Sequence, residues 1–159
     1  MDSFHCMWSF LFLLLMVSFG DMIKDKPDPA AKQLFYDIMK ASGYNALIRP
    51  SAGPNPEDKL TVKLGLRLSQ VLSVDEKNQI LTISVWLRQE WYDLRLRWDP
   101  LEYGDVKVLN IPSEELWKPD LVLYNNADGD FQITLKTKAI IYNDGRIVWE
   151  PPAIYKSYC

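Results

Sequence analysis

The spacing of apolar residues changes along the chain from a helical period to a strand period. Early in the chain, four apolar residues recur at i,i+4 and form one stripe: Leu34 with Ile38, and Phe35 with Met39. Asp28 supplies an N-cap acceptor and Pro29 suits the first helical position, so the pattern predicts a helix that begins here. Gly43 follows the stripe and marks its end. Residues 44–58, which are rich in proline, are predicted to form a loop.

From Val62 onward, apolar residues alternate with polar ones, as in a half-buried strand. The apolar members are Val62, Leu64, Leu66, Leu68, Leu72 and Val74. A turn over Asp75–Asn78 leads into a second strand over Leu81–Trp91. Its odd-numbered apolar residues form one face: Leu81, Ile83, Val85, Leu87 and Trp91. We expect Trp91 and Trp98 to lie in the core.

Trp86 occupies the opposite, polar face of the second strand, among Thr82, Ser84, Arg88 and Glu90. Strand alternation would place a solvated residue there. One interpretation is that this face is also covered, by a second sheet or by a neighbouring subunit. The other is that the indole offers its π face to a cation in a binding surface. Alternation alone leaves both open.

The last part of the chain predicts a hairpin. Its first strand has one apolar face, made of Phe131, Ile133, Leu135, Ala139 and Ile141. A three-residue turn, Asn143–Gly145, sets a register that pairs Ile141 with Ile147 and Ala139 with Trp149. The same register places Ile140 opposite Val148 on the outer face, so two apolar residues are expected to be exposed side by side. Pro151–Pro152 is predicted to end the strand, because proline cannot donate to a ladder.

Residues 1–20 predict a secretory signal peptide. The apolar run Met7–Phe19 is too short to span a bilayer, and small residues at Ser18 and Gly20 resemble a cleavage site. Asp2 and His5 depart from the usual basic start, so an uncleaved signal anchor is the alternative. No later run is apolar enough to span a membrane. We therefore expect an exported chain whose domain covers residues 21–159.

Composition excludes several classes of function. The formal net charge is −3, and no basic block is present, which argues against a nucleic-acid partner. After the signal peptide there is no histidine, and Cys159 is the only cysteine. Nucleophile systems built on Ser-His or Cys-His, and metal sites built on His and Cys, are therefore unavailable. No phosphate-binding glycine loop is present. We expect neither an enzyme nor a cofactor or metal site.

Several long motifs in order resemble the extracellular domain of nicotinic acetylcholine receptor subunits, members of the Cys-loop family of pentameric ligand-gated channels. They are LIRP (47–50), VWLRQEWYDLRLRWDP (85–100), WKPDLVLYNNADGDF (117–131) and PPAIYKSYC (151–159). The segments ADGDF (127–131) and PPAIYKSYC (151–159) are similar to those of α-type subunits. The resemblance implies a mainly β fold, in which an N-terminal helix precedes an immunoglobulin-like sandwich that is incomplete here.

The resemblance also implies site residues. In the family, acetylcholine or a similar quaternary ammonium agonist sits at an interface between subunits of a pentamer, in an aromatic cage. Tyr124 matches the principal-face tyrosine of the first binding loop, although packing at a strand end is its alternative role. Trp86 matches the complementary-face tryptophan. Ile140, Val148 and Glu150 match the complementary-face hairpin, with Glu150 at a position where subunits vary.

Cys159 matches the first cysteine of the Cys-loop, whose partner is expected shortly downstream. We therefore expect a domain truncated at this residue, without the pore and with part of the site missing. Such a product should be marginally stable and prone to aggregate. Three functions remain open: a channel subunit on the extracellular side of the synaptic membrane, a soluble secreted acetylcholine-binding protein, or a truncated subunit that modulates receptor assembly.

Overall fold

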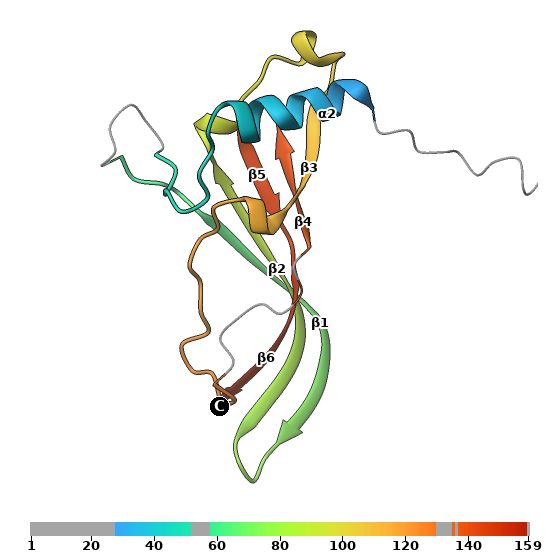
Figure 1. Ribbon diagram of the computed structural model, residues 1–159. Coiled ribbons are helices and arrows are strands. Elements are labelled where there is room, and N and C mark those ends of the chain that lie inside the picture. The colour runs from blue at the N-terminus through green and yellow to red at the C-terminus, as the bar shows by residue number, and fades with distance from the viewer. Residues whose placement is uncertain (1–27, 52–57, 130–134, 136, 159) are drawn as a thin grey trace, which may run out of the picture.

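The computed structural model describes residues 28–51, 58–129, 135 and 137–158 of the chain. Within them the protein forms a helix, α2 (Pro29–Tyr36), and a six-stranded antiparallel sheet (Figure 1). The strands are β1 (Lys63–Asp75), β2 (Ile80–Tyr92), β3 (Val108–Pro112), β4 (Lys138–Tyr142), β5 (Arg146–Trp149) and β6 (Pro152–Tyr158). The mainly β fold with an N-terminal helix is confirmed, and the described residues contain one sheet of the expected sandwich.

Some expected features lie outside the described residues. These are the signal peptide at residues 1–20, the strand residues Phe131 and Ile133, and Cys159. Short helical turns connect the main elements. They are a π-helical turn at Asp37–Ala41 and 3-10 helices at Leu94–Leu96, Pro100–Tyr103 and Ser113–Glu115.

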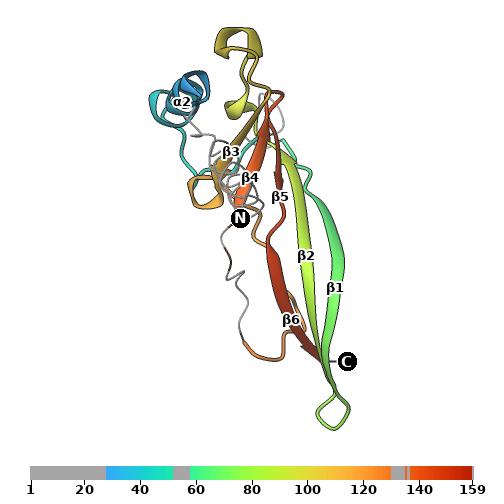
Figure 2. The same cartoon turned by 90° about the vertical axis from the view of Figure 1, so that its right-hand side faces the viewer.

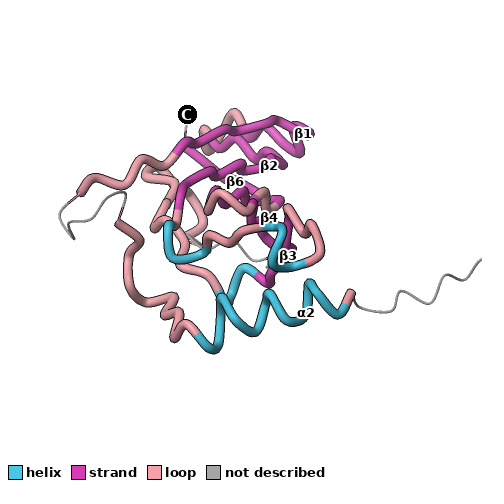
Figure 3. The backbone as a smooth tube through the Cα atoms, turned by 90° about the horizontal axis from the view of Figure 1, so that it is seen from above, coloured by secondary structure: helices cyan, strands magenta, loops and turns pink. Residues whose placement is uncertain are grey.

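Strand β2 pairs with three other strands of the sheet, whose order is β1-β2-β5-β4-β3 with β6 also on β2. Along its other edge β2 pairs with β6 from Ile80 to Trp86 and with β5 from Gln89 to Tyr92. The β1–β2 hairpin and β6 extend well past the other strands, as the side view in Figure 2 shows. The helix α2 lies beside β3 and β4, on the side of the molecule away from β1 (Figure 3).

The helix forms as its sequence pattern predicts. The Asp28 side chain accepts a hydrogen bond from the Ala30 amide at 3.0 Å, and Pro29 is the first helical residue. The predicted stripe packs on the core, with Leu34, Ile38 and Met39 buried and Phe35 partly buried. The sheet side of this core includes Trp91, Trp98, Ile111, Ile141 and Ile147, so both predicted core tryptophans are confirmed.

Strand β1 exists as predicted, but its apolar face is not half-buried. Leu64, Leu66 and Leu68 are each more than half exposed, because β1 is an edge strand with a neighbour on one side only. The predicted parity also fails at Leu72, although Val74 returns to the predicted face. Register shifts at two points of the β1–β2 ladder bring Val71 and Val74, and not Leu72, opposite the apolar Ile83 and Leu81 of β2.

The hairpin of β4 and β5 has the predicted register, with Ile141 opposite Ile147 and Ile140 opposite Val148. The strand ends before Pro151–Pro152 as predicted, since β5 stops at Trp149, but pairing with β2 resumes at Pro152. The chain continues as β6 along the same neighbour, and the Pro151 carbonyl accepts a hydrogen bond from the Leu87 amide at 3.0 Å. Proline lacks only the donor, so it is tolerated where the ladder needs an acceptor.

A buried polar cluster holds the loop after the helix against the end of β2. The Asp93 carboxylate is fully buried and lies 2.7 Å from Arg95. The Tyr44 hydroxyl donates to Asp93 at 3.2 Å and accepts from the Trp117 amide at 3.1 Å. Arg95 also donates to the Ile48 carbonyl at 3.0 Å. Segments distant in sequence are therefore joined around the satisfied, buried carboxylate of Asp93, and losing its partners would be costly.

We predict that Leu34→Ala lowers the free energy of unfolding by about 2–5 kcal/mol, because a fully buried leucine leaves a cavity in the core. Leu47→Ala is the matched control, since Leu47 is 91% exposed, and its effect should stay within about 0.5 kcal/mol. Urea unfolding of the full chain, followed by tryptophan fluorescence, measures both. Equal losses from the two variants would contradict the packing of α2 described above.

Burial raises the pKa of Tyr44 from 10.0 to about 12, and the Asp93 carboxylate adds to the rise. A pKa raised in the folded state gives stability that is present below pH 10 and lost as pH rises toward 12. We therefore predict that Tyr44→Phe removes part of the alkaline loss of stability, and also removes one late phenolate transition from an absorbance titration. Tyr36→Phe, at an exposed tyrosine of α2, should leave that late transition in place.

Candidate functional site

Cross-strand pairing gathers four of the sequence-predicted site residues on one face of the sheet. Directly opposed residues of antiparallel strands share a face, and so do residues two apart along a strand. On β2, Trp86 and Glu90 therefore share a face, and Glu90 lies opposite Val148. Val148 in turn lies opposite Ile140 of β4. Glu150, two residues after Val148, approaches this face from the end of β5.

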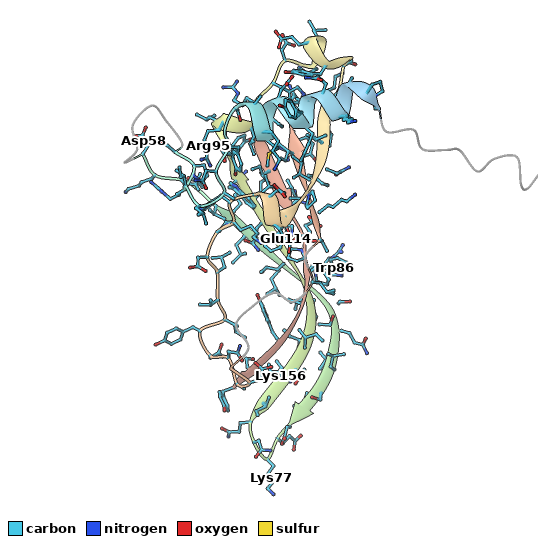
Figure 4. All side chains as sticks on the ribbon, in the orientation of Figure 1. Asp58, Lys77, Trp86, Arg95, Glu114 and Lys156 are labelled. Atoms are coloured by element: carbon cyan, nitrogen blue, oxygen red, sulfur yellow. The ribbon has the colours of Figure 1, made fainter. Side chains whose placement is uncertain are left out.

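Trp86 lies on the solvent-facing side of β2, as strand parity predicts, and is 37% exposed. Its direct partner across the hairpin is Arg67 of β1, whose guanidinium carbon is 5.7 Å from the centroid of the Trp86 ring. This distance is typical of a cation–π contact. Figure 4 shows Trp86 midway along the long hairpin, well away from Lys77 at the hairpin turn.

A cluster of ion pairs surrounds Glu90 on the same face. Arg88 lies 3.2 Å from Glu90 and 2.7 Å from Glu150. Lys63 lies 3.2 Å from Glu90, and Arg146 lies 3.9 Å from it. The hydrogen bond from Arg88, together with the charges of Lys63 and Arg146, lowers the pKa of the Glu90 carboxyl below its usual value. Both carboxylates of this face are therefore already engaged by cations.

Ile140 and Val148 differ in exposure, which corrects the prediction that both are exposed. Ile140 is 36% exposed, whereas Val148 is only 5% exposed. Val148 has a strand on each side and faces the longer side chain of Glu90 across one of them. Long neighbouring side chains cover the short valine. Strand parity therefore predicts the correct face for Val148 but overestimates the exposed fraction of its side chain.

Tyr124 is not brought together with the other candidates. It is 99% exposed, which rules out the alternative that it packs at a strand end. The residues after it run beside the outer edge of β6, where the Tyr158 amide donates to the Asn125 carbonyl at 3.2 Å and Asn126 bridges to Ser157. Strand β6 therefore separates Tyr124 from β2 and Trp86. Cys159 lies outside the described residues.

Arg67 is the contact residue of Trp86 that sequence reasoning missed. Its alternation with Leu66 and Leu68 places it on the polar side of β1, but only the hairpin register identifies its partner. Counting residues back from the turn at Asp75–Asn78 would have placed Ser69 opposite Trp86, because the two register shifts lie between the turn and Arg67. Among the described residues, no three His, Cys, Asp or Glu side chains group to hold a metal ion.

Comparison with known proteins decides the family. The sequence model described as the neurotransmitter-gated ion-channel ligand binding domain matches residues 31–159. The chain belongs to the neurotransmitter-gated ion-channel ligand-binding domain family. The helix, the antiparallel sheet and the long β1–β2 hairpin are thus parts of a ligand-binding domain. Within the described ranges, no helix has the length and apolar character needed to cross a membrane.

Relatives of this ligand-binding domain are acetylcholine receptor subunits. The acetylcholine receptor subunit alpha-like of Manduca sexta is 52% identical over 132 residues, covering 83% of this chain and 25% of the relative. The alpha-type subunit unc-38 of Caenorhabditis elegans is 51% identical over 153 residues, covering 96% of this chain and 29% of the relative. The human neuronal acetylcholine receptor subunit alpha-4 is 56% identical over 118 residues, covering 74% of this chain and 18% of the relative.

The chain thus spans less than a third of the length of these relatives. The predicted resemblance to nicotinic acetylcholine receptor subunits is confirmed. The relatives are receptor subunits and not enzymes, so the prediction that the chain is not an enzyme is confirmed as well. A beta-like subunit of Drosophila melanogaster is 48% identical over 155 residues, so the similarity is not confined to alpha-type subunits.

We predict that Glu90→Gln lowers stability at neutral pH by about 1 kcal/mol or less, the range of exposed ion pairs. A carboxyl whose pKa is lowered in the folded state gives stability that is present above its ordinary value of 4.5 and lost as pH falls through the folded pKa. The variant should therefore lose less stability in acid than the wild-type chain. Urea midpoints at neutral and acidic pH measure this, with Glu76→Gln in the β1–β2 turn as the control.

Proposed function

We propose that this ligand-binding domain contributes one wall of an acetylcholine site formed between two receptor subunits, with Trp86 as its aromatic surface. The observation that carries the proposal is an indole exposed on the sheet face that also bears the apolar residues Ile140 and Val148. A quaternary ammonium has no hydrogen-bond donor, so its recognition depends on aromatic faces and on desolvation. Trp86 and the two aliphatic residues supply both.

An open sheet face cannot enclose a small ligand by itself, and a site usually buries most of its ligand. A second wall is therefore needed. Tyr124 lies beyond the outer edge of β6, so a single copy cannot bring it onto Trp86. A chain with two different half-sites on separate surfaces pairs head to tail, and such contacts generate a ring where the rotation between subunits closes. This supports the expected pentamer, in which Tyr124 of one subunit faces Trp86 of the next.

Within such a site the residues have distinct roles. Trp86 would attract the ammonium through its ring, and Tyr124 would add a ring face and a hydroxyl from the neighbouring subunit. Ile140 and Val148 would exclude water from the agonist. Glu150 is held by Arg88 at 2.7 Å, so it shapes the rim and does not offer a free carboxylate to the ligand.

At the level of the whole protein, we propose a subunit of a nicotinic-type ligand-gated cation channel, with this domain on the extracellular side of the plasma membrane. Agonist capture would draw the two walls of the site together, and this movement would be transmitted to the pore. The names of the acetylcholine receptor relatives support this proposal. No cofactor is needed, because recognition uses side chains alone.

We predict that Trp86→Ala lowers agonist affinity at least about tenfold, because it removes the ring that faces the ammonium. Trp86→Phe, which keeps a smaller ring, should lose less. The measurement is acetylcholine competition binding at the cell surface, on receptors assembled from full-length subunits that carry this domain. Tyr36→Ala is the control, because Tyr36 is an exposed aromatic residue of α2 away from this face. Parallel loss of surface expression and affinity for Trp86→Ala would assign the indole a structural role.

A further inference from the structure

The Trp86 ring is already paired with a cation of its own chain. Arg67 lies directly opposite Trp86 in the β1–β2 ladder, and its guanidinium carbon is 5.7 Å from the ring centroid. Both side chains are exposed on the same face. The proposed site therefore has a positive charge at the surface that an ammonium ligand would use.

Arg67 and Arg88 differ in how their charges are balanced. Arg88 contacts two carboxylates, Glu150 at 2.7 Å and Glu90 at 3.2 Å. Glu90 is in addition shared with Lys63 and Arg146. Among the described residues, the ring of Trp86 is the contact of Arg67, and no carboxylate lies within ion-pair distance of it. Arg88 is thus neutralised in place, whereas the charge of Arg67 is not.

We propose that Arg67 is a specificity-determining residue, which competes with the ligand ammonium for the face of Trp86 and so weakens the binding of permanent cations. This inference rests on the function proposed above. A cationic ligand must displace the guanidinium from the ring and then tolerate a like charge nearby, and both steps oppose binding. A ligand that lacks a charge meets only the first cost.

The inference predicts a gain of affinity from removing a side chain at the site. Arg67→Gln should tighten the binding of acetylcholine about threefold to tenfold, since exposed cation–π contacts and screened repulsion are each of this order. Binding of 3,3-dimethylbutyl acetate, the uncharged carbon analogue of acetylcholine, should tighten less than that of acetylcholine, because Arg67→Gln spares this ligand only the displacement of the guanidinium from the ring. Arg67→Lys keeps the charge and should remain within about twofold of wild type for acetylcholine.

The assay is competition binding on assembled full-length receptors, with surface expression measured for every variant. Lys77→Gln is the matched control, because it removes the same charge from the same hairpin at the turn, away from Trp86 (Figure 4). Unchanged or weaker acetylcholine binding by Arg67→Gln would overturn the inference. So would equal tightening by Lys77→Gln or Arg67→Lys, or equal tightening toward the uncharged analogue.

Trp86→Ala separates the inference from the function on which it rests. Unchanged acetylcholine affinity in Trp86→Ala would refute the proposed function and the inference with it. A loss of affinity in Trp86→Ala, combined with no gain in Arg67→Gln, would leave the proposed function standing and refute only the competition by Arg67. In the double variant, Arg67→Gln should give no further gain, because the ring for which it competes is absent.

Discussion

The side-chain alternation of β2 is the constraint on which the rest of the structure depends. Hydrogen bonds on both edges of β2 fix its orientation, since β1 pairs with one edge and β5 and β6 share the other. Its odd-numbered residues Val85, Leu87 and Trp91 are then buried in the domain, and Trp86, Arg88 and Glu90 point the other way. A shift of one residue would exchange these two faces completely. The core and the proposed binding face are therefore specified together.

Ion pairs balance most of the charge on the proposed binding face. Glu90 and Glu150 hold three basic side chains between them, so the polar part of the face is ordered by its own ion pairs. Ion pairs with exposed partners add little stability. They do restrict the conformations of the long side chains Lys63, Arg88 and Arg146 on this face. The exposed apolar part of the face consists of Trp86 and Ile140. A ligand would therefore meet a surface whose side chains are already positioned.

Much of the fold and part of the candidate site could be predicted from sequence. Features set by neighbouring residues were predictable, and features set by residues distant in sequence were not. Local signals were sufficient for the α2 cap at Asp28, the parity of β2 and the β4–β5 register at Gly145. They failed where the outcome depends on distant neighbours. The bulges of β1 and the cover over Val148 arise from pairing partners that periodicity does not reveal. Tyr124 and Arg67 needed the topology, because strand neighbours decide which side chains meet.

The two register shifts of β1 have a consequence for the surface of the molecule. An edge strand presents unpaired amide and carbonyl groups, and an apolar one invites another strand to join it. Each bulge in β1 breaks the regular spacing of those groups and adds local twist, so an incoming strand could bond only to short stretches. The same two register shifts that interrupt the apolar alternation of β1 thereby disfavour the edge-to-edge pairing of chains into fibrils.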